Sequence, residues 1–324
     1  MACIHILLST YNGEAFLRIQ LESLLAQTHT DWCLWARDEG STDTSVSILT
    51  KISARDSRIQ LLPNTEGRLG VKAAFAHLAQ IANQNDAHYF AFCDQDDLWH
   101  PNKLATLLDC IQTQEARTGA TTPTLSACDL RISDTQGKLI APSHYQLAGA
   151  IPWQRTDNNW LFAHNLIPGC SMLGNRALLQ AALPQAKEAV MHDWWFAATA
   201  ALLGEICWVP TPLIDYRQHA QNAVGAHSIQ QRMFSTFTRP AKQWQRWQRQ
   251  FALTLVQNQA LLTQHAKEET MHCYQQLAQF TASPSLPGMH ERLRQFEKSG
   301  VQALSFARQI QLKLLIAKGM SLDL

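Results

Sequence analysis

The stretch Tyr89-Phe90-Ala91-Phe92-Cys93-Asp94-Gln95-Asp96-Asp97-Leu98-Trp99 joins an apolar run to a group of carboxylates. A continuous apolar run is typical of a strand that is buried on both faces of a sheet. In open α/β sheets, ligands bind at the carboxyl ends of such strands, which is where Asp94, Asp96 and Asp97 stand. Clustered carboxylates repel one another, so the run favours a site for a hard divalent cation and a diphosphate. The alternative is a solvated acidic turn that caps the next helix.

Short apolar runs alternate with helical patterns along the first two thirds of the chain. This alternation, with short polar links, predicts an α/β fold with a mostly parallel, Rossmann-like sheet and helices on both faces. The predicted strands are 3–8, 32–36, 59–62, 89–93, 124–132, 206–209 and 213–216, and the predicted helices are 14–27, 43–54, 71–83, 103–115, 153–164, 176–182 and 191–203.

The composition changes beyond residue 225. No acidic residue occurs between Asp215 and Glu268, and the pattern to Leu324 is rich in Gln and Leu and helical in period. We therefore expect a catalytic domain over residues 1–225 and a helical C-terminal region over residues 226–324.

The overall composition excludes several classes of protein. The 324 residues carry a net charge of +1, whereas nucleic-acid binders usually present a basic face, so no nucleic-acid partner is expected. The eight cysteines are scattered and form no C-x-x-C pair, so we interpret them as small buried hydrophobes and not as a disulfide frame or a zinc site.

Phosphate-binding fingerprints are also missing. No G-x-G-x-x-G follows the first strand and no G-x-x-x-x-G-K-[ST] occurs in the chain, which argues against a nicotinamide dehydrogenase and a P-loop ATPase. A bound phosphate would then need a cation, which returns attention to Asp94, Asp96 and Asp97.

The sequence predicts a cytoplasmic protein. Its first residues lack a basic region followed by a long apolar one, so no signal peptide is expected, and no apolar stretch approaches the ~20 residues of a membrane span. Segment 232–251 interleaves basic residues with Trp244, Trp247 and Phe251. It suits peripheral contact with the inner face of the cytoplasmic membrane, and packing on the catalytic domain is the alternative.

Residues 4–225 resemble the family 2 glycosyltransferases, which have the GT-A fold. The resemblance rests on the blocks 9–13, 37–43, 94–97 and 192–195, which stand in the family's order. Within the family, the segments 94–99, 101–104, 192–195 and 216–219 are most similar to the rhamnosyltransferase-like members. One departure is Glu39, which stands where Asp is commoner and keeps the carboxylate.

The resemblance implies a binding site for a nucleotide. Thr10 and Tyr11 would flank the base, and Asp38 would accept a hydrogen bond from the imide N–H of uracil or thymine. Asp94 would hold the ribose. A third nucleotide loop would include Gly67, where glycine lets backbone approach a ligand, and Lys72, whose alternative is a solvated helix position.

The resemblance also implies the groups that act on the sugar. Asp96 would bind Mg²⁺ or Mn²⁺, and His219 is a further candidate ligand whose alternative is a structural role. Asp193 would take the proton of the acceptor hydroxyl, which predicts inversion at the anomeric carbon, although an Asp before an apolar helical run also suits a helix N-cap. The residues expected to contact the sugar or the acceptor are Asp97, Trp99, Trp194 and Trp195.

These residues together predict an inverting, metal-dependent glycosyltransferase. Its donor would be a UDP- or dTDP-sugar, with dTDP-rhamnose as one candidate, and its acceptor a bacterial surface glycan that is lipid-linked in many family members. Two alternatives are a sugar-nucleotide-forming nucleotidyltransferase, which should carry a Gly-rich basic loop in place of residues 9–13, and a non-catalytic nucleotide-binding module, which would not need Asp193.

Overall fold

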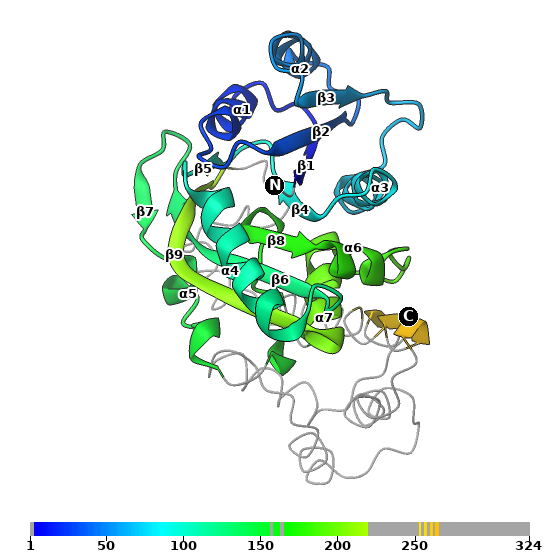
Figure 1. The fold of residues 1–324 in the computed structure, drawn as a ribbon. Helices are drawn as coiled ribbons and strands as arrows, with labels where there is room; N and C mark the ends of the chain where they lie inside the picture. Colours follow the sequence, from blue (N-terminus) through cyan, green and yellow to red (C-terminus); the bar gives the residue numbers. More distant parts are fainter. Residues whose placement is uncertain are drawn as a thin grey trace, which may run out of the picture.

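A single mixed sheet organises the part of the chain that the computed structural model describes, namely residues 3–155, 158–162 and 165–219 with helical positions 253, 256, 257, 260, 261 and 263–265. Its nine strands have the order β3-β2-β1-β4-β8-β6-β9-β5, and β7 pairs with β6 (Figure 1). The strands are β1 (Ile4–Thr10), β2 (Trp32–Asp38), β3 (Ile59–Leu62), β4 (Tyr89–Cys93), β5 (Leu98–Trp99), β6 (Thr124–Ser133), β7 (Leu139–Ala141), β8 (Met172–Asn175) and β9 (Glu205–Arg217).

Helices lie on both faces of this sheet, and Figure 1 shows α1, α2 and α3 around the N-terminal strands and α4 over β6 and β9. The helices are α1 (Leu17–Leu25), α2 (Ser45–Ser53), α3 (Val71–Gln84), α4 (Lys103–Thr118), α5 (His144–Leu147), α6 (Arg176–Ala182) and α7 (His192–Leu203), with short 3₁₀ turns η1 (Pro152–Gln154), η2 (Asn159–Phe162) and η3 (Gly169–Ser171).

Strand direction divides the sheet into two halves. β3, β2, β1 and β4 are parallel, β8 runs antiparallel between β4 and β6, and β6 and β9 are parallel to each other. The short strands β5 and β7 run antiparallel to β9 and β6. The prediction of a mostly parallel α/β sheet with flanking helices is confirmed. The carboxyl ends of β1, β2 and β4 therefore meet at one edge, as parallel strands require.

Alternation along β1 shows how the core is divided. Leu7 packs with α3, α6 and α7 on one face, whereas Ile6 and Leu8 pack with α1, α2 and α4 on the other. On α1, the helical spacing of Leu17 and Leu21 turns both side chains into that second core. Each fully buried side chain of this size contributes about 1.5–3 kcal/mol, so the apolar periodicity itself holds the layers together.

Two predicted elements are wrong. Segment 153–164 forms short 3₁₀ turns where it is described, and not a helix. Residues 205–217 form one strand, although Pro210 and Pro212 predicted a break. The β6–β9 register shifts on either side of Asp129, and such irregular positions are where a strand accommodates proline.

The predicted boundary at residue 225 and segment 232–251 lie outside the described residues, so both stay predictions. Of the region 226–324, some of the described positions pack against the catalytic domain. Leu261 is buried in the core beside α6 and α7, and Gln257 Oε1 accepts a hydrogen bond from Val190 N at 2.7 Å. Among the described helices, none is both long and apolar enough to cross a bilayer.

Candidate active site

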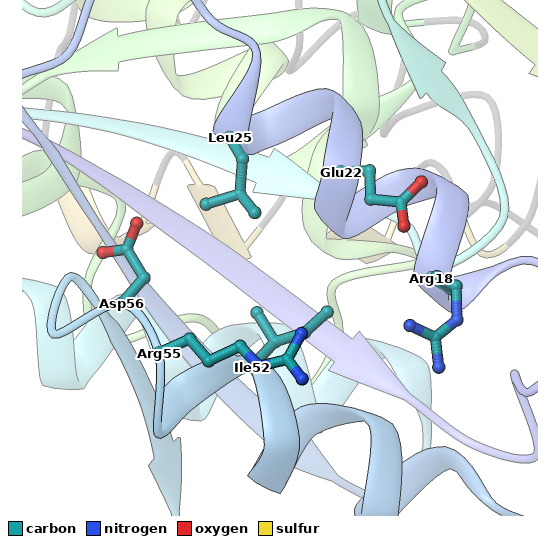
Figure 2. A pocket seen from close by; sticks show the side chains of 6 residues that line it. All are labelled: Arg18, Glu22, Leu25, Ile52, Arg55 and Asp56. Atoms are coloured by element: carbon teal, nitrogen blue, oxygen red, sulfur yellow. The ribbon is translucent and has the colours of Figure 1, made fainter.

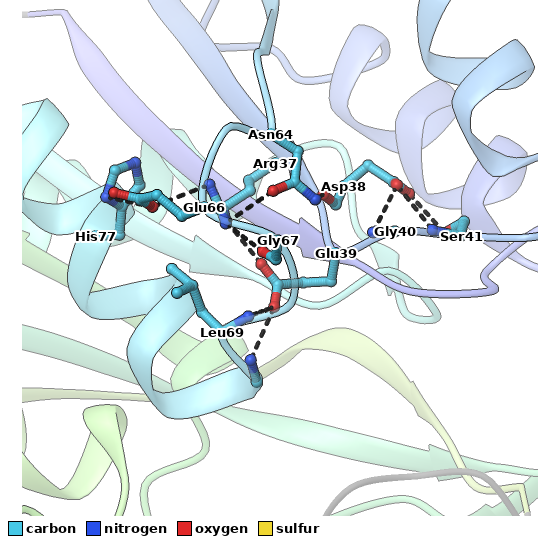
Figure 3. Close-up of polar contacts among 11 residues, drawn as sticks. Arg37, Asp38, Glu39, Gly40, Ser41, Asn64, Glu66, Gly67, Leu69 and His77 are labelled. Atoms are coloured by element: carbon cyan, nitrogen blue, oxygen red, sulfur yellow. Dashed lines mark hydrogen bonds and ion pairs between the residues drawn. The ribbon is translucent and has the colours of Figure 1, made fainter.

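Two charged residues at the carboxyl end of β2, Arg37 within the strand and Glu39 directly after it, hold the loop that follows β3 (Figure 3). Arg37 is fully buried, and its Nε donates to Glu39 Oε1 at 2.7 Å while Nη2 donates to Asn64 Oδ1 at 3.2 Å and to the Gly67 carbonyl at 2.8 Å. Glu39 Oε2 accepts from the backbone N–H groups of Leu69 at 2.7 Å and Gly70 at 2.8 Å. Charge-assisted hydrogen bonds of this kind are short and strong, so the loop around Gly67 is fixed in shape.

Asp38, the predicted reader of the base, is held in one orientation. Its Oδ2 accepts from the backbone N–H groups of Gly40 and Ser41, each at 2.9 Å, and its Oδ1 accepts from Ser41 Oγ at 2.5 Å (Figure 3). Each carboxylate oxygen has two lone pairs, so these bonds orient the group and leave it able to accept from a ligand.

Gln95, the middle residue of the Asp94-Gln95-Asp96 run, binds the loop that follows β1. Its Oε1 accepts from Thr10 Oγ1 at 2.6 Å and from Tyr11 N at 2.9 Å, and its Nε2 donates to the Tyr11 carbonyl at 3.3 Å. A Cβ on Gly13 would lie 2.4 Å from Gln95 Oε1, so a larger residue there would displace the Gln95 amide from these hydrogen bonds. Sequence reasoning missed this role because the middle position of a D-x-D pattern reads as a spacer.

The structure brings together the two residues predicted to bind a metal. His219 Nε2 lies 2.7 Å from Asp96 Oδ2, and the His219 ring stacks on Phe16 with ring centroids 5.0 Å apart. Arg217 Nε donates to the Asp96 carbonyl at 3.2 Å. The carboxylate and the imidazole come from segments far apart in sequence, and the antiparallel pairing of β5 with β9 places them side by side.

Asp97 and Trp99 were predicted to contact a sugar, and the structure contradicts both predictions. Asp97 is fully buried, and its Oδ1 accepts from Arg217 N at 3.4 Å. Trp99 is 1% exposed, with Lys103 Nζ 2.8 Å from its ring centroid. The antiparallel β5–β9 pair begins directly after Asp97, and both side chains are buried, with Trp99 in the core beside α1 and α4.

Burial changes the proton affinity of this layer. The pKa of Asp97 is well above its ordinary value because the group is buried and lies near Asp96 and Asp94. The pKa of the buried Lys103 ammonium is lowered to about 8, chiefly by desolvation. Burial therefore disfavours the charged forms of both Asp97 and Lys103, and Asp97 is adjacent in sequence to the metal-binding candidate Asp96.

Asp193 lies in the first turn of α7, facing the acidic end of β4 across η3. Its Oδ2 accepts from Gly169 N at 3.2 Å and its Oδ1 accepts from Trp194 N at 2.6 Å. Burial raises its pKa to about 6, and burial, Asp96 and Asp193 together raise the pKa of Asp94 to about 7. The N-cap of α7 is Met191, so Asp193 is not the capping residue.

Two further predicted contacts are corrected by the structure, and a third residue has structural partners. Trp194 and Trp195 are buried, and their indole N–H groups donate to the carbonyls of Leu161 and Ala182, so neither ring faces a sugar. Residues 194–200, which follow Asp193, are all buried, so α7 is enclosed on every side over these two turns. Lys72 Nζ donates to the carbonyls of Lys187 at 2.9 Å and Ala189 at 2.8 Å, which ties α3 to the segment before α7. Its role in binding a nucleotide stays a prediction.

A separate groove of about 210 Å³ lies between α1 and α2 (Figure 2). Its lining mixes charges of both signs with apolar side chains and includes none of the strand-end residues. The lining residues are Arg18, Glu22, Leu25, Ile52, Arg55 and Asp56.

The family model described as Glycosyl transferase family 2 matches residues 5–180, more than half of the chain. The chain belongs to this family. This family 2 glycosyltransferase is 26% identical over 234 residues to the dTDP-rhamnosyl transferase RfbG of Shigella flexneri, which covers 68% of the chain and 74% of RfbG. The rhamnosyltransferase-like resemblance of the sequence is confirmed.

Solved structures show the same fold at low sequence identity. TarS 1–349 of S. aureus, in complex with UDP-GlcNAc, has a TM-score of 0.53 at 15% identity, covering 92% of this chain and 79% of TarS. The mannosyltransferase PcManGT of Pyrobaculum calidifontis, in complex with GDP-Man and Mn²⁺, has a TM-score of 0.50 at 17% identity, covering 97% and 85%. The predicted GT-A fold is confirmed, and the chain is a glycosyltransferase.

Proposed function

We propose that this glycosyltransferase moves a sugar from a UDP- or dTDP-sugar to a hydroxyl of a glycan, with inversion at the anomeric carbon and with a divalent cation. The observation that carries the proposal is the position of Asp193, which faces Asp94 across η3 and has its carboxylate oriented by two backbone N–H groups. A general base opposite a diphosphate-binding strand end is what backside displacement needs.

The donor site is argued from the loops that follow β1, β2 and β3. Asp38 is an acceptor held in one orientation, and both uracil and thymine present an imide N–H to such a group. RfbG is named for dTDP-rhamnosyl transfer and TarS was solved with UDP-GlcNAc, so relatives of both kinds use bases with this N–H. We favour dTDP-rhamnose as the donor because RfbG is 26% identical to this chain, whereas TarS is 15% identical.

The cation would be held by Asp96 and His219, and Asp94 would hold the ribose. A carboxylate beside an imidazole, completed by diphosphate oxygens, is a donor set dominated by oxygen, which suits Mn²⁺ or Mg²⁺. When bound, the cation neutralises charge that develops on the leaving nucleoside diphosphate. The buried Asp97 and Arg217 position Asp96 from below, through the contacts of Arg217 with both residues.

The chemical step then belongs to Asp193. Its carboxylate accepts the proton of the acceptor hydroxyl while the hydroxyl oxygen bonds to the anomeric carbon and the bond from that carbon to the phosphate oxygen breaks. Gly169 N and Trp194 N hold the carboxylate in place, so its orientation costs nothing at the moment of reaction. A pKa near 6 leaves it ionised at neutral pH and still a useful base.

The acceptor is proposed as a growing bacterial surface glycan, lipid-linked, met at the cytoplasmic face of the membrane. The sequence supports this through its resemblance to the rhamnosyltransferase-like members and through the basic, Trp-bearing segment 232–251. A vesicle-sedimentation assay with anionic and neutral lipids checks the membrane part, which fails if the full chain stays in the supernatant with both.

A thermal-shift screen with UDP, dTDP, GDP and CDP, each with and without Mn²⁺, tests the donor site. We expect stabilisation by UDP and dTDP that depends on Mn²⁺ and that is lost in Asp96→Ala. Equal stabilisation by CDP would contradict the role of Asp38.

Product analysis tests which reaction the protein catalyses. Release of a nucleoside diphosphate indicates sugar transfer, whereas release of pyrophosphate from a nucleoside triphosphate indicates the nucleotidyltransferase. Binding without turnover of any acceptor tried indicates the non-catalytic module.

A further inference from the structure

A second group of metal-binding side chains lies at the opposite edge of the sheet, where β1 and β2 begin. Cys3 directly precedes β1, His5 is its second residue, and the parallel register pairs His5 with Cys33 of β2. Side chains two apart on a strand share a face, so the three project together. One ligand atom from each residue lies within 4.8 Å of the other two.

Two further polar residues lie near this group. Asp31 directly precedes β2 and is close enough to Cys3 to act, after burial, on the pKa of its thiol. His88 directly precedes β4 and is close enough to lower the pKa of His5. Because burial also lowers that pKa, the His5 imidazole is neutral, which is the form that binds metals.

The two thiols are unsuited to two other roles. Burial, followed by Cys3, raises the pKa of Cys33 to about 12, which argues against a reactive thiolate. Cys3 and Cys33 occupy diagonal positions on neighbouring strands, where Cα atoms lie ~7–8 Å apart, beyond the usual reach of a disulfide.

In contrast to the sequence-based interpretation of the cysteines as small buried hydrophobes, we propose that Cys3, His5 and Cys33 bind one Zn²⁺, with the Asp31 carboxylate or a water as fourth ligand. Two sulfurs and an imidazole nitrogen select a thiophilic cation such as Zn²⁺ over Mg²⁺ or Mn²⁺. The site lies at the amino ends of strands whose carboxyl ends carry the catalytic residues, so its role is structural. It joins the starts of β1 and β2.

The tautomer of His5 provides a specific signature. Trp35 Nε1 donates to His5 Nδ1 at 3.1 Å, and a neutral imidazole has only one nitrogen lone pair. Zn²⁺ must take that lone pair, or the proton must move to Nδ1, and either change breaks the hydrogen bond from Trp35. Zinc binding should therefore change the Trp35 fluorescence, and Trp35→Phe should bind zinc at least as tightly as the wild type.

The test uses the full chain, freed of metal by a chelator and kept in millimolar Mg²⁺. We expect one equivalent of Zn²⁺ to bind, and mass spectrometry should show Cys3 and Cys33 protected from alkylation while Cys110 and Cys207, a second neighbouring thiol pair, are not. The double variant Cys3→Ser/Cys33→Ser should lose more than the ~10–100-fold in affinity that removal of an outer-sphere partner costs, whereas Cys110→Ser/Cys207→Ser should keep it.

Several results would overturn the proposal. The first is alkylation of Cys3 and Cys33 in the wild-type chain at the same rate with and without zinc. This result overturns the proposal even if the variants do not fold. Unchanged zinc affinity in the folded Cys3→Ser/Cys33→Ser variant, or a native Cys3–Cys33 disulfide, would also overturn it. Asp96→Ala should retain the equivalent of zinc, so failure of the proposed catalytic metal site leaves this one to be judged separately.

Discussion

The loops that follow β2 and β3 and the acidic end of β4 lie at the same edge of the sheet, yet they treat polar groups in opposite ways. Around Arg37 and Glu39, the buried charges are paired with each other and extended by hydrogen bonds to backbone, so the surface is formed in advance. Only Arg37 Nη1 has no hydrogen-bond partner among the described residues there, and it lies 3.5 Å from Glu66 Oε2. Around Asp97 and Lys103, buried charges are under-compensated, and Asp97 Oδ2 and Lys103 Nζ have no hydrogen-bond partner among the described residues.

This difference indicates that the loops after β2 and β3 recognise the nucleoside and that the acidic end of β4 is the site of sugar transfer. A satisfied network is rigid and selects a ligand by shape and by hydrogen bonds, which suits a nucleoside. Buried groups with shifted pKa values gather where charge changes during a reaction, which suits the site of sugar transfer. Substitutions in the two regions should therefore have different kinds of effect, and four experiments separate them.

The largest effect is expected for Asp193→Asn, in the reacting region. The amide cannot accept the acceptor's proton, so kcat should fall by about 10²–10⁴-fold, while the thermal shift caused by the donor nucleotide and Mn²⁺ stays within error. Steady-state kinetics and the thermal shift measure the two parts. Near-wild-type turnover would remove Asp193 from the role of base.

The second experiment breaks the recognising region. Arg37→Met leaves the buried Glu39 carboxylate without its cation, which should lower the free energy of unfolding by about 3–5 kcal/mol. Arg58→Met is the matched control, because the Arg58–Asp56 pair is partly exposed and should contribute about 0–1 kcal/mol. Urea denaturation measures the free energy of unfolding of both variants. Equal losses in the two variants would show that the buried Arg37–Glu39 pair contributes no more than an exposed ion pair.

The third experiment weakens recognition without breaking the fold. Gln95→Leu leaves the Thr10 hydroxyl and the Tyr11 N–H without their acceptor, at a cost of about 1–3 kcal/mol. We expect the KM for the donor to rise while kcat changes less. The loop that follows β1 is no longer held by Gln95, whereas the position of Asp193 does not depend on this residue. Gln60→Leu, at an exposed position of β3, is the control. A fall in kcat alone would place Gln95 in the reacting region.

The smallest effect is the pH dependence of the wild type. Asp193 acts as a base only when ionised, and burial raises its pKa to about 6, so activity should be lost as pH falls through that value. Between pH 7 and pH 5 the ionised fraction falls about tenfold, and kcat/KM at saturating Mn²⁺ should fall with it. An acid limb that begins only below pH 4.5 would mean that the carboxylate is not desolvated during the reaction.

The sequence predicted the fold and the strand-end residues because both depend on local pattern. Apolar runs ending in Asp38 and Asp94 place these carboxylates at the same edge of any parallel sheet, and the alternation of strands and helices fixes the sheet. The aromatic residues were predicted less well. Trp99, Trp194 and Trp195 stand beside catalytic positions in sequence, but neighbours on a strand or helix point in different directions, and these three point into the core.

The amino-acid sequence by itself determined the class of fold, the family and the acidic end of β4, since periodicity and short motifs are local properties of the chain. Only the tertiary structure decided which groups meet across long separations: His219 with Asp96, Gln95 with Thr10, and Cys3 with Cys33. The physical reason is that such contacts depend on strand register and side-chain direction, and both are set by how the whole sheet packs.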